Sequence, residues 1–142
     1  MNKEFQLVRD WKAIRGIGGD ESQTFETRVQ SQYQRVLQEC IEIHEAIVLN
    51  DEDEFQDAIG DTIVTLINLA AIKGYNAEDC LDKAFNVIKL RKGITRSTGD
   101  FVRYAKLSDE DKKFCDEKQG SPGDQYFALN QLEVLTPENF KK

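Results

Sequence analysis

Apolar residues recur at every third or fourth position through most of the chain before residue 93, which is the period of an amphipathic α-helix. This period predicts a helix over residues 4–15, a second from Ser22 or Thr24 to near Asn50, a third from Asp51 or Asp53 to Lys73, and a fourth over residues 77–92. No segment shows the alternation of a β-strand. Long amphipathic helices with short connections are typical of antiparallel packing. We therefore expect an all-α fold built as an antiparallel four-helix bundle.

The third predicted helix is apolar around most of its surface and carries one narrow polar stripe. At about 100° per residue, its apolar side chains occupy roughly two-thirds of the circumference. The stripe contains Glu54, Asp57, Asp61, Thr65 and Asn68 within an arc of about 80°. Such a helix is normally buried between other helices, where an unpaired carboxylate is costly. The stripe therefore suggests that a bound cation offsets the negative charge.

A second acidic group, formed by Glu39, Glu42 and Glu45, precedes the stripe at helical spacing. Taken alone, it is more simply interpreted as a solvated helix surface. A tight turn at Asn50 would nevertheless fold the two helices into an antiparallel hairpin and bring both acidic groups together. The carboxylates that would converge between the helices are Glu39, Glu42, Asp57 and Asp61. An all-oxygen set of this kind suits Mg²⁺ or Mn²⁺.

Two other kinds of metal site fit the sequence less well. Di-iron bundle proteins use Glu-x-x-His, but the only histidine, His44, lies two residues after Glu42. His44 projects onto the apolar face of the second helix, where we expect it to be a core residue. An EF-hand needs a glycine-centred loop of oxygen ligands, and the acidic run over residues 50–54 has no such glycine. We expect that run to be an exposed helix cap.

Positive charge gathers near the end of the fourth helix, at Lys89, Arg91 and Lys92. Cations often complement a helix C-terminus, which accounts for one or two of these residues. The same segment is also a candidate to bind phosphate oxygens, with Asn86 as a further ligand. Trp11 is a candidate to stack on a base, although a lone tryptophan in an amphipathic helix more often belongs to the core.

The overall composition indicates a compact domain without a nucleic-acid or membrane partner. The formal net charge of −7 over 142 residues argues against a nucleic-acid surface, which is ordinarily basic. Residues 1–6 are polar and no apolar run comes near the length of a membrane span, so we expect a cytoplasmic protein. Cys40, Cys80 and Cys115 form no C-x-x-C pair, and we expect reduced thiols, with Cys40 and Cys80 in the core.

The last part of the chain is less regular. Ser108 predicts the start of a short helix that ends near Glu117, and the mixed apolar stretch over residues 126–135 has no firm assignment. We therefore expect an all-α domain over residues 1–103. A C-terminal extension over residues 104–142 would pack on the bundle or on a neighbouring subunit.

The acidic and basic motifs together resemble those of the MazG-type all-α nucleoside triphosphate pyrophosphohydrolases. Glu39-x-x-Glu42 followed by Asp61 is similar to the family's Glu-Glu-x-x-Glu and Glu-x-x-Asp motifs, each on its own helix. The similarity continues through the segment from Asn86 to Gly93 and covers about residues 7–103.

Two positions depart from the family pattern. Gln38 stands where the first motif often has a glutamate, and Ala58 stands where the second motif has one. Asp57, one position before Ala58, is the expected replacement ligand, as in the small phage-type relatives that the chain most resembles.

The resemblance implies Mg²⁺-dependent hydrolysis of (deoxy)nucleoside triphosphates to the monophosphate and pyrophosphate, by a homodimer or homotetramer. The expected ligands of Mg²⁺, or of Mn²⁺, are Glu39, Glu42, Asp57 and Asp61. The expected catalytic residues are Glu39, Glu42, Asp61 and Glu45, with Glu42 or Glu45 as the base for a metal-activated water. The expected substrate-binding residues are Trp11, Asn86, Lys89, Arg91 and Lys92, of which Lys89 and Arg91 would neutralise charge on the leaving pyrophosphate.

Two alternative functions remain open from the sequence. A non-catalytic helical interaction module would assemble through its helix faces and turn over no nucleotide. Phosphoribosyl-ATP pyrophosphohydrolase activity on the same fold would differ in its substrate. Release of pyrophosphate from a panel of nucleotides, with and without Mg²⁺, separates the three possibilities.

Overall fold

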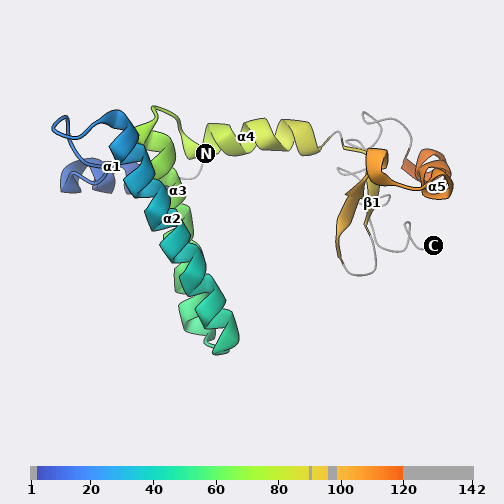
Figure 1. Cartoon of the computed structure of the whole chain (residues 1–142), viewed down its shortest axis with the longest axis horizontal. Coiled ribbons are helices and arrows are strands. Elements are labelled where there is room, and N and C mark those ends of the chain that lie inside the picture. Colours follow the sequence, from blue (N-terminus) through green and yellow to red (C-terminus); the bar gives the residue numbers. More distant parts are fainter. Residues whose placement is uncertain (1–2, 90, 96–98, 120–142) are drawn as a thin grey trace. The chain divides into compact units, whose positions relative to one another are not determined.

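The computed structural model describes residues 3–89, 91–95 and 99–119. Most of these residues are in α-helices, so the chain is predominantly helical, as expected (Figure 1). The chain divides into two compact units, Met1–Leu81 and Asp82–Lys142, whereas the sequence pattern placed a boundary after residue 103. The unassigned stretch 126–135 lies outside the described residues.

The described part of the first unit contains α1 (Lys3–Arg15), α2 (Phe25–Val48), α3 (Glu52–Ile72) and the first turn of α4 (Ala77–Ile88). The hydroxyl of Thr24 accepts a hydrogen bond from the backbone N–H of Thr27 at 3.1 Å. The carboxylate of Asp51 accepts one from the backbone N–H of Glu54 at 3.0 Å. Each cap satisfies an N–H group that a helix start leaves without a partner. Two of the caps considered from the sequence, Thr24 and Asp51, therefore set the starts of α2 and α3.

α2 and α3 lie side by side as an antiparallel hairpin (Figure 1). Asn50 makes the turn with a positive φ of 53°, a conformation that asparagine adopts more readily than most residues. The backbone N–H of Asp51 then donates to the carbonyl of Ala46 at 3.0 Å. The buried apolar residues of this unit are Val36, Ala46, Ala58, Ile67 and Ile72. Because Ala46 and Ala58 are small and fully buried, the two backbones can approach closely near the turn.

Three residues that were expected in the core are exposed: Cys40, His44 and Cys80. For Cys40 and His44 the prediction was wrong because the apolar face of α2 is wider than the strip that packs on α3. Cys80 lies on α4, none of whose residues is buried. All three cysteines of the chain are free thiols, and only Cys115 is buried.

The expectation that other helices cover α3 on most sides is also wrong for the described chain. Ile59, Ile63 and Leu66 are 39%, 42% and 45% exposed. α2 likewise leaves Ile41 and Ile47 more than half exposed. The hairpin therefore presents an apolar surface to its surroundings as well as an apolar interior.

α3 has the length and the mean hydropathy, 1.2, of a membrane-spanning helix. One such helix is weak evidence for a membrane protein, because a central helix of a soluble protein has the same properties. α3 carries Asp57 and Asp61 and packs along α2, which suits a soluble protein.

The second unit contains a short β-hairpin that the sequence did not predict. β1 (Gly93–Thr95) pairs antiparallel with β2 (Phe101–Arg103), and α4 ends at Ile88 instead of continuing to residue 92. Strands of three residues are too short to show a recognisable alternation. Gly93 is required in β1, because a Cβ atom there would collide with the backbone carbonyl oxygen of Val102.

A 3₁₀-helix, η1 (Tyr104–Lys106), leads from the hairpin into α5 (Asp109–Gln119). The hydroxyl of Ser108 caps α5 by accepting a hydrogen bond from the backbone N–H of Asp111 at 3.2 Å, so the predicted short helix is confirmed. The small core of this unit comprises Ile94, Leu107 and Cys115, with Val102, Tyr104 and Phe114 packed against it.

An ion pair attaches α1 to the start of α4 within the first unit. Nη1 and Nη2 of Arg9 donate to the two carboxylate oxygens of Glu78 at 2.6 and 2.7 Å. Bidentate pairs of this kind are among the stronger hydrogen-bonded contacts. The hydrogen bonds from Arg9 hold the pKa of the Glu78 carboxyl below its usual value.

We expect Glu78→Gln to lower the melting temperature by a few degrees at neutral pH. Because the pKa of Glu78 is lowered in the folded state, its contribution to stability is present above the unfolded-state pKa and is lost as the pH falls through the folded-state pKa. The difference in Tm between wild type and variant should therefore be constant near neutrality and shrink below about pH 4.5. Melting curves from pH 3 to 8 measure this difference, and a gap that persists unchanged at pH 3 would contradict the assignment.

Candidate metal centre

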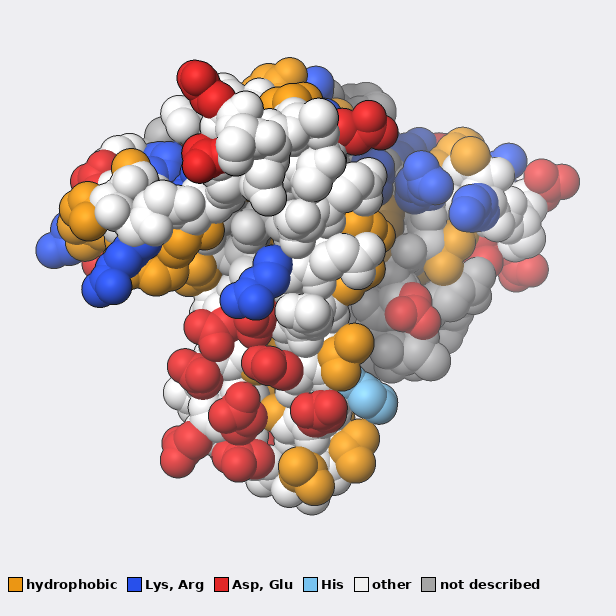
Figure 2. Space-filling model, turned by 60° about the vertical axis from the view of Figure 1, so that its left-hand side comes forward, with side chains coloured by type: hydrophobic (Ala, Val, Ile, Leu, Met, Phe, Trp, Pro, Cys, Tyr) orange, Lys and Arg blue, Asp and Glu red, His pale blue; other side chains and the backbone are white. Residues whose placement is uncertain are grey.

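The α2–α3 hairpin brings three of the four expected metal ligands together. Carboxylate oxygens of Glu39, Glu42 and Asp61 lie within 4.8 Å of one another. Glu39 and Glu42 are one turn apart on α2, and Asp61 faces them from α3 because the helices run antiparallel. Figure 2 shows acidic side chains gathered over this part of the hairpin. The spacing is suitable for one divalent cation with oxygen ligands.

The fourth expected ligand, Asp57, lies one turn before Asp61 on α3 and is exposed. Burial is the largest cause that raises the pKa of Asp61, and the charges of Asp57 and Glu42 raise it further. Glu45 is one turn beyond Glu42 on α2 and is exposed. Its proposed role as a base stays a prediction.

The carboxylates repel one another in the absence of a cation. Burial is the largest cause that raises the pKa of Glu39, and the neighbouring carboxylates of Glu42 and Asp61 raise it further. Burial is likewise the largest cause that raises the pKa of Glu54, and the charges of Asp57 and Glu42 add to it. Ionising these groups at neutral pH therefore costs folding free energy. A bound divalent cation would offset that cost.

One oxygen of the group is also without a hydrogen-bond partner. Oε2 of Glu39 is buried and accepts no hydrogen bond from the residues that the structure describes. A desolvated carboxylate oxygen is expensive unless a donor or a cation satisfies it. The orphaned oxygen is therefore an observation, separate from the clustering, that fits a bound cation.

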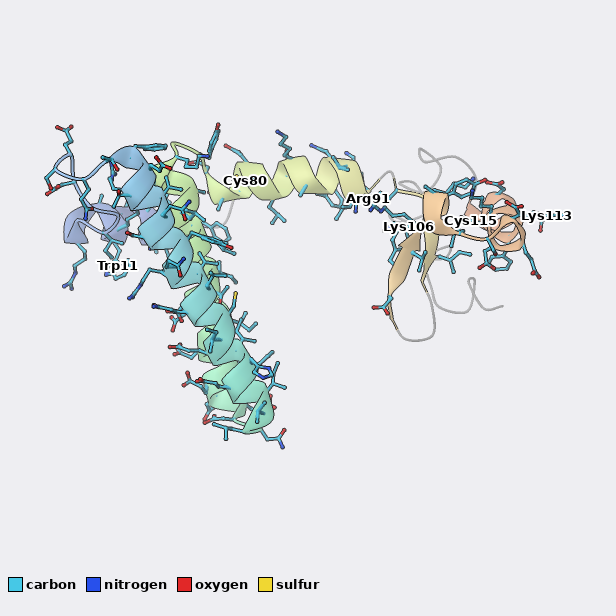
Figure 3. The ribbon with its side chains drawn as sticks, viewed as in Figure 1. Trp11, Cys80, Arg91, Lys106, Lys113 and Cys115 are labelled. Carbon is cyan, nitrogen blue, oxygen red and sulfur yellow. The ribbon has the colours of Figure 1, made fainter. Side chains whose placement is uncertain are left out.

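A cavity of about 450 Å³ adjoins the carboxylates within the first unit. Its charged and aromatic lining residues are Trp11, Arg28, Arg35, Glu39 and Asp61, and its buried polar lining residues are Gln32, Thr65 and Asn68. The volume is in the usual range for a small-molecule site. Trp11, labelled on α1 in Figure 3, is among the residues that line this cavity, and its role in stacking on a base stays a prediction.

Sequence reasoning missed the two arginines of this cavity. Arg35 lies four residues before Glu39 on the same face of α2, so the period of the helix could have identified it. Nε of Arg28 donates to the carbonyl of Gly18 at 2.8 Å, which holds its guanidinium against the loop after α1. Only the fold shows that this loop borders the cavity.

The expected phosphate-binding residues of the fourth helix belong to the second unit. Lys92 pairs with Asp116 and lies 4.6 Å from the centre of the Tyr104 ring. Asn86 makes a long hydrogen bond of 3.4 Å to Asp82, and Arg91, labelled in Figure 3, follows α4. Their role toward a ligand of the carboxylates stays a prediction, as does that of Lys89.

Comparison of the chain with protein-family models, with curated proteins and with solved structures finds no match.

We expect millimolar Mg²⁺ to raise the melting temperature of the wild-type chain. A ligand present at 100 times its Kd adds about 2.7 kcal/mol to the stability of the folded state. Asp61→Asn should melt higher than wild type in metal-free buffer, because it removes one repelling charge, and it should lose the response to Mg²⁺. Asp53→Asn, an exposed position on the same helix, is the matched control and should keep the response. An equal Mg²⁺ response in Asp61→Asn would exclude Asp61 as a ligand.

Proposed function

We propose that this chain is a MazG-type nucleoside triphosphate pyrophosphohydrolase that uses Mg²⁺ and also accepts Mn²⁺. The convergence of Glu39, Glu42 and Asp61 beside a cavity with arginine and aromatic walls carries the proposal. Carboxylates alone would suit many cation sites. Carboxylates next to guanidinium groups suit a ligand that is itself anionic and metal-bound, such as a triphosphate.

In this proposal Glu39, Glu42 and Asp61 hold the ion, with Asp57 as a further ligand. Bound Mg²⁺ supplies Lewis-acid stabilisation of phosphate oxygens and lowers the pKa of water. The chain's own contribution is to position the triphosphate and to accept a proton from the attacking water, for which Glu42 and Glu45 are the candidate bases. The products are the nucleoside monophosphate and pyrophosphate.

In this proposal the arginines of the first unit supply positive charge for the phosphates. Arg28 and Arg35 line the cavity beside the carboxylates. A guanidinium group can donate two hydrogen bonds to two oxygens of one phosphate. Lys89 and Arg91 are the residues implied by the family motif, with Asn86 and Lys92 as neighbours. These groups would neutralise charge that develops on the leaving pyrophosphate.

We further propose that the active form is a cytoplasmic homodimer or homotetramer in which the helices complete a four-helix bundle. The exposed apolar side chains of α2 and α3 support this proposal, because contiguous apolar surface usually marks an interaction site. The same surface would suit a non-catalytic interaction module, which would show neither nucleotide turnover nor a specific effect of Mg²⁺.

We expect Asp61→Ala to abolish release of pyrophosphate while the chain stays folded. Pyrophosphate is measured from a panel of ribo- and deoxynucleoside triphosphates and from phosphoribosyl-ATP, with and without Mg²⁺. Asp53→Ala is the control and should turn over like wild type. Wild-type turnover by Asp61→Ala would contradict its assignment as a ligand, and no turnover of any substrate by wild type would favour the interaction module.

We expect Arg91→Ala to lower kcat/KM at least tenfold, since a charge-assisted hydrogen bond contributes about 1.5–3 kcal/mol. Lys89→Ala should have a smaller effect because the neighbouring Lys92 can substitute for it. If these residues only complement the end of α4, the substitutions should instead cost less than about 1 kcal/mol of stability. Kinetics and a melting curve for each variant separate the two roles, and unchanged kinetics with a lowered Tm would favour the structural one.

A further inference from the structure

Three polar side chains are buried where α2 packs on α3: Gln32, Thr65 and Asn68, which are 6%, 7% and 3% exposed. Nε2 of Gln32 donates to the carbonyl of Thr65 at 3.2 Å. The hydroxyl of Thr65 donates to the carbonyl of Thr62 at 2.8 Å. Oδ1 of Asn68, in contrast, accepts no hydrogen bond from the described residues. Asn68, the most buried of the three side chains, therefore has an amide oxygen that accepts no hydrogen bond from the described residues.

An apolar residue at position 68 would avoid this cost. Buried polar groups in folded proteins are nearly always hydrogen-bonded, and each exception needs an explanation. Asn68 lines the cavity that also contains Glu39 and Asp61. A ligand in that cavity can supply the missing partner. The terminal torsion of an asparagine is broad, so the carboxamide can present either its oxygen or its NH₂ group.

Helix geometry fixes the distance of Asn68 from the candidate metal ligands. Asp61 and Asn68 are seven residues apart on α3, so they share one face and are separated by about 10.5 Å along the axis. A nucleotide whose phosphates lie at Asp61 would place its base, not its phosphates, toward Asn68. Trp11 lines the same cavity from α1. A carboxamide for the edge of a ring and an indole for its face are the usual groups that recognise a nucleobase.

We propose that Asn68 determines base specificity by hydrogen bonding to the edge of the nucleobase, while Trp11 stacks on its face. The proposal rests on the proposed function for the class of ligand, a nucleotide. The preferred base would present an N–H donor beside an acceptor, which pairs with both ends of a carboxamide. Asn68 is a specificity-determining residue in this scheme and takes no part in the chemical step.

The test measures binding of the reaction products, which carry the base but cannot release pyrophosphate. Isothermal titration calorimetry with the ribo- and deoxynucleoside 5′-monophosphates of all five common bases, in Mg²⁺ buffer, ranks the bases for wild type. Asn68→Leu should weaken binding of the preferred base about tenfold and bring the others to a similar affinity. Asn68→Asp, which keeps the shape but not the donor, should change the ranking. Gln56→Leu, at an exposed amide of the same helix, should leave the ranking unchanged.

Stability provides the second measurement. Asn68→Leu removes an unsatisfied acceptor, so its Tm without ligand should equal or exceed that of wild type. A lower Tm, with the wild-type ranking of bases retained, would mean that Asn68 is structural and would overturn the proposal. If Asn68→Leu instead changed the preference for ribose over deoxyribose equally for every base, the proposal would be overturned as well. That result would place the sugar, not the base, at Asn68.

The outcomes also distinguish this proposal from the proposed function. Base-selective binding that Asn68→Leu abolishes, without release of pyrophosphate from any triphosphate, would support base recognition and contradict the hydrolase. Release of pyrophosphate with an unchanged base ranking in both Asn68 variants would support the hydrolase and overturn base recognition.

Discussion

The close antiparallel contact of α2 with α3 is the constraint on which the candidate site depends. It is set by a left-handed turn at Asn50 and by small buried residues at positions 46 and 58. Once the two helices are held at this distance, the helical period aligns Glu39 and Glu42 with Asp61. The same contact buries Asn68 two turns further along α3. One interface therefore produces both the cluster of carboxylates and the buried amide whose oxygen has no hydrogen-bond partner among the described residues.

Both features are unfavourable for the fold without a ligand. Mutually repelling carboxylates and an unused amide oxygen each oppose folding, and the apolar contacts of the hairpin must outweigh them. Residues that break the usual rules for a protein interior are commonly found at functional sites, because the missing interactions are supplied by a ligand. The described part of the first unit fits this pattern, since the two buried oxygens without a hydrogen-bond partner, on Glu39 and Asn68, belong to residues that line one cavity.

Much of the first unit could be predicted from the sequence because its determinants are local. The caps at Thr24 and Asp51, and the spacing of Glu39, Glu42 and Asp61, follow from one helix period and one turn. The roles of Arg28 and the exposure of His44 could not be predicted in this way. The exposure of His44 depends on which strip of α2 is covered by α3. The position of Arg28 at the cavity depends on the loop after α1, which only the fold brings there. In the second unit, strands of three residues leave no period to detect, so the β-hairpin was missed.

The ion pair between Arg9 and Glu78 has a consequence for how the cavity responds to its medium. α1 provides Trp11, two residues after Arg9, and the ion pair clips that helix to the start of α4. The two side chains are only 15% and 9% exposed, and salt screens partly buried pairs much less than exposed ones. One wall of the cavity is thus attached by a charged contact that is largely protected from dissolved salt. The attachment of Trp11 to the first unit would therefore persist at high ionic strength and be lost on acidification, when Glu78 is protonated.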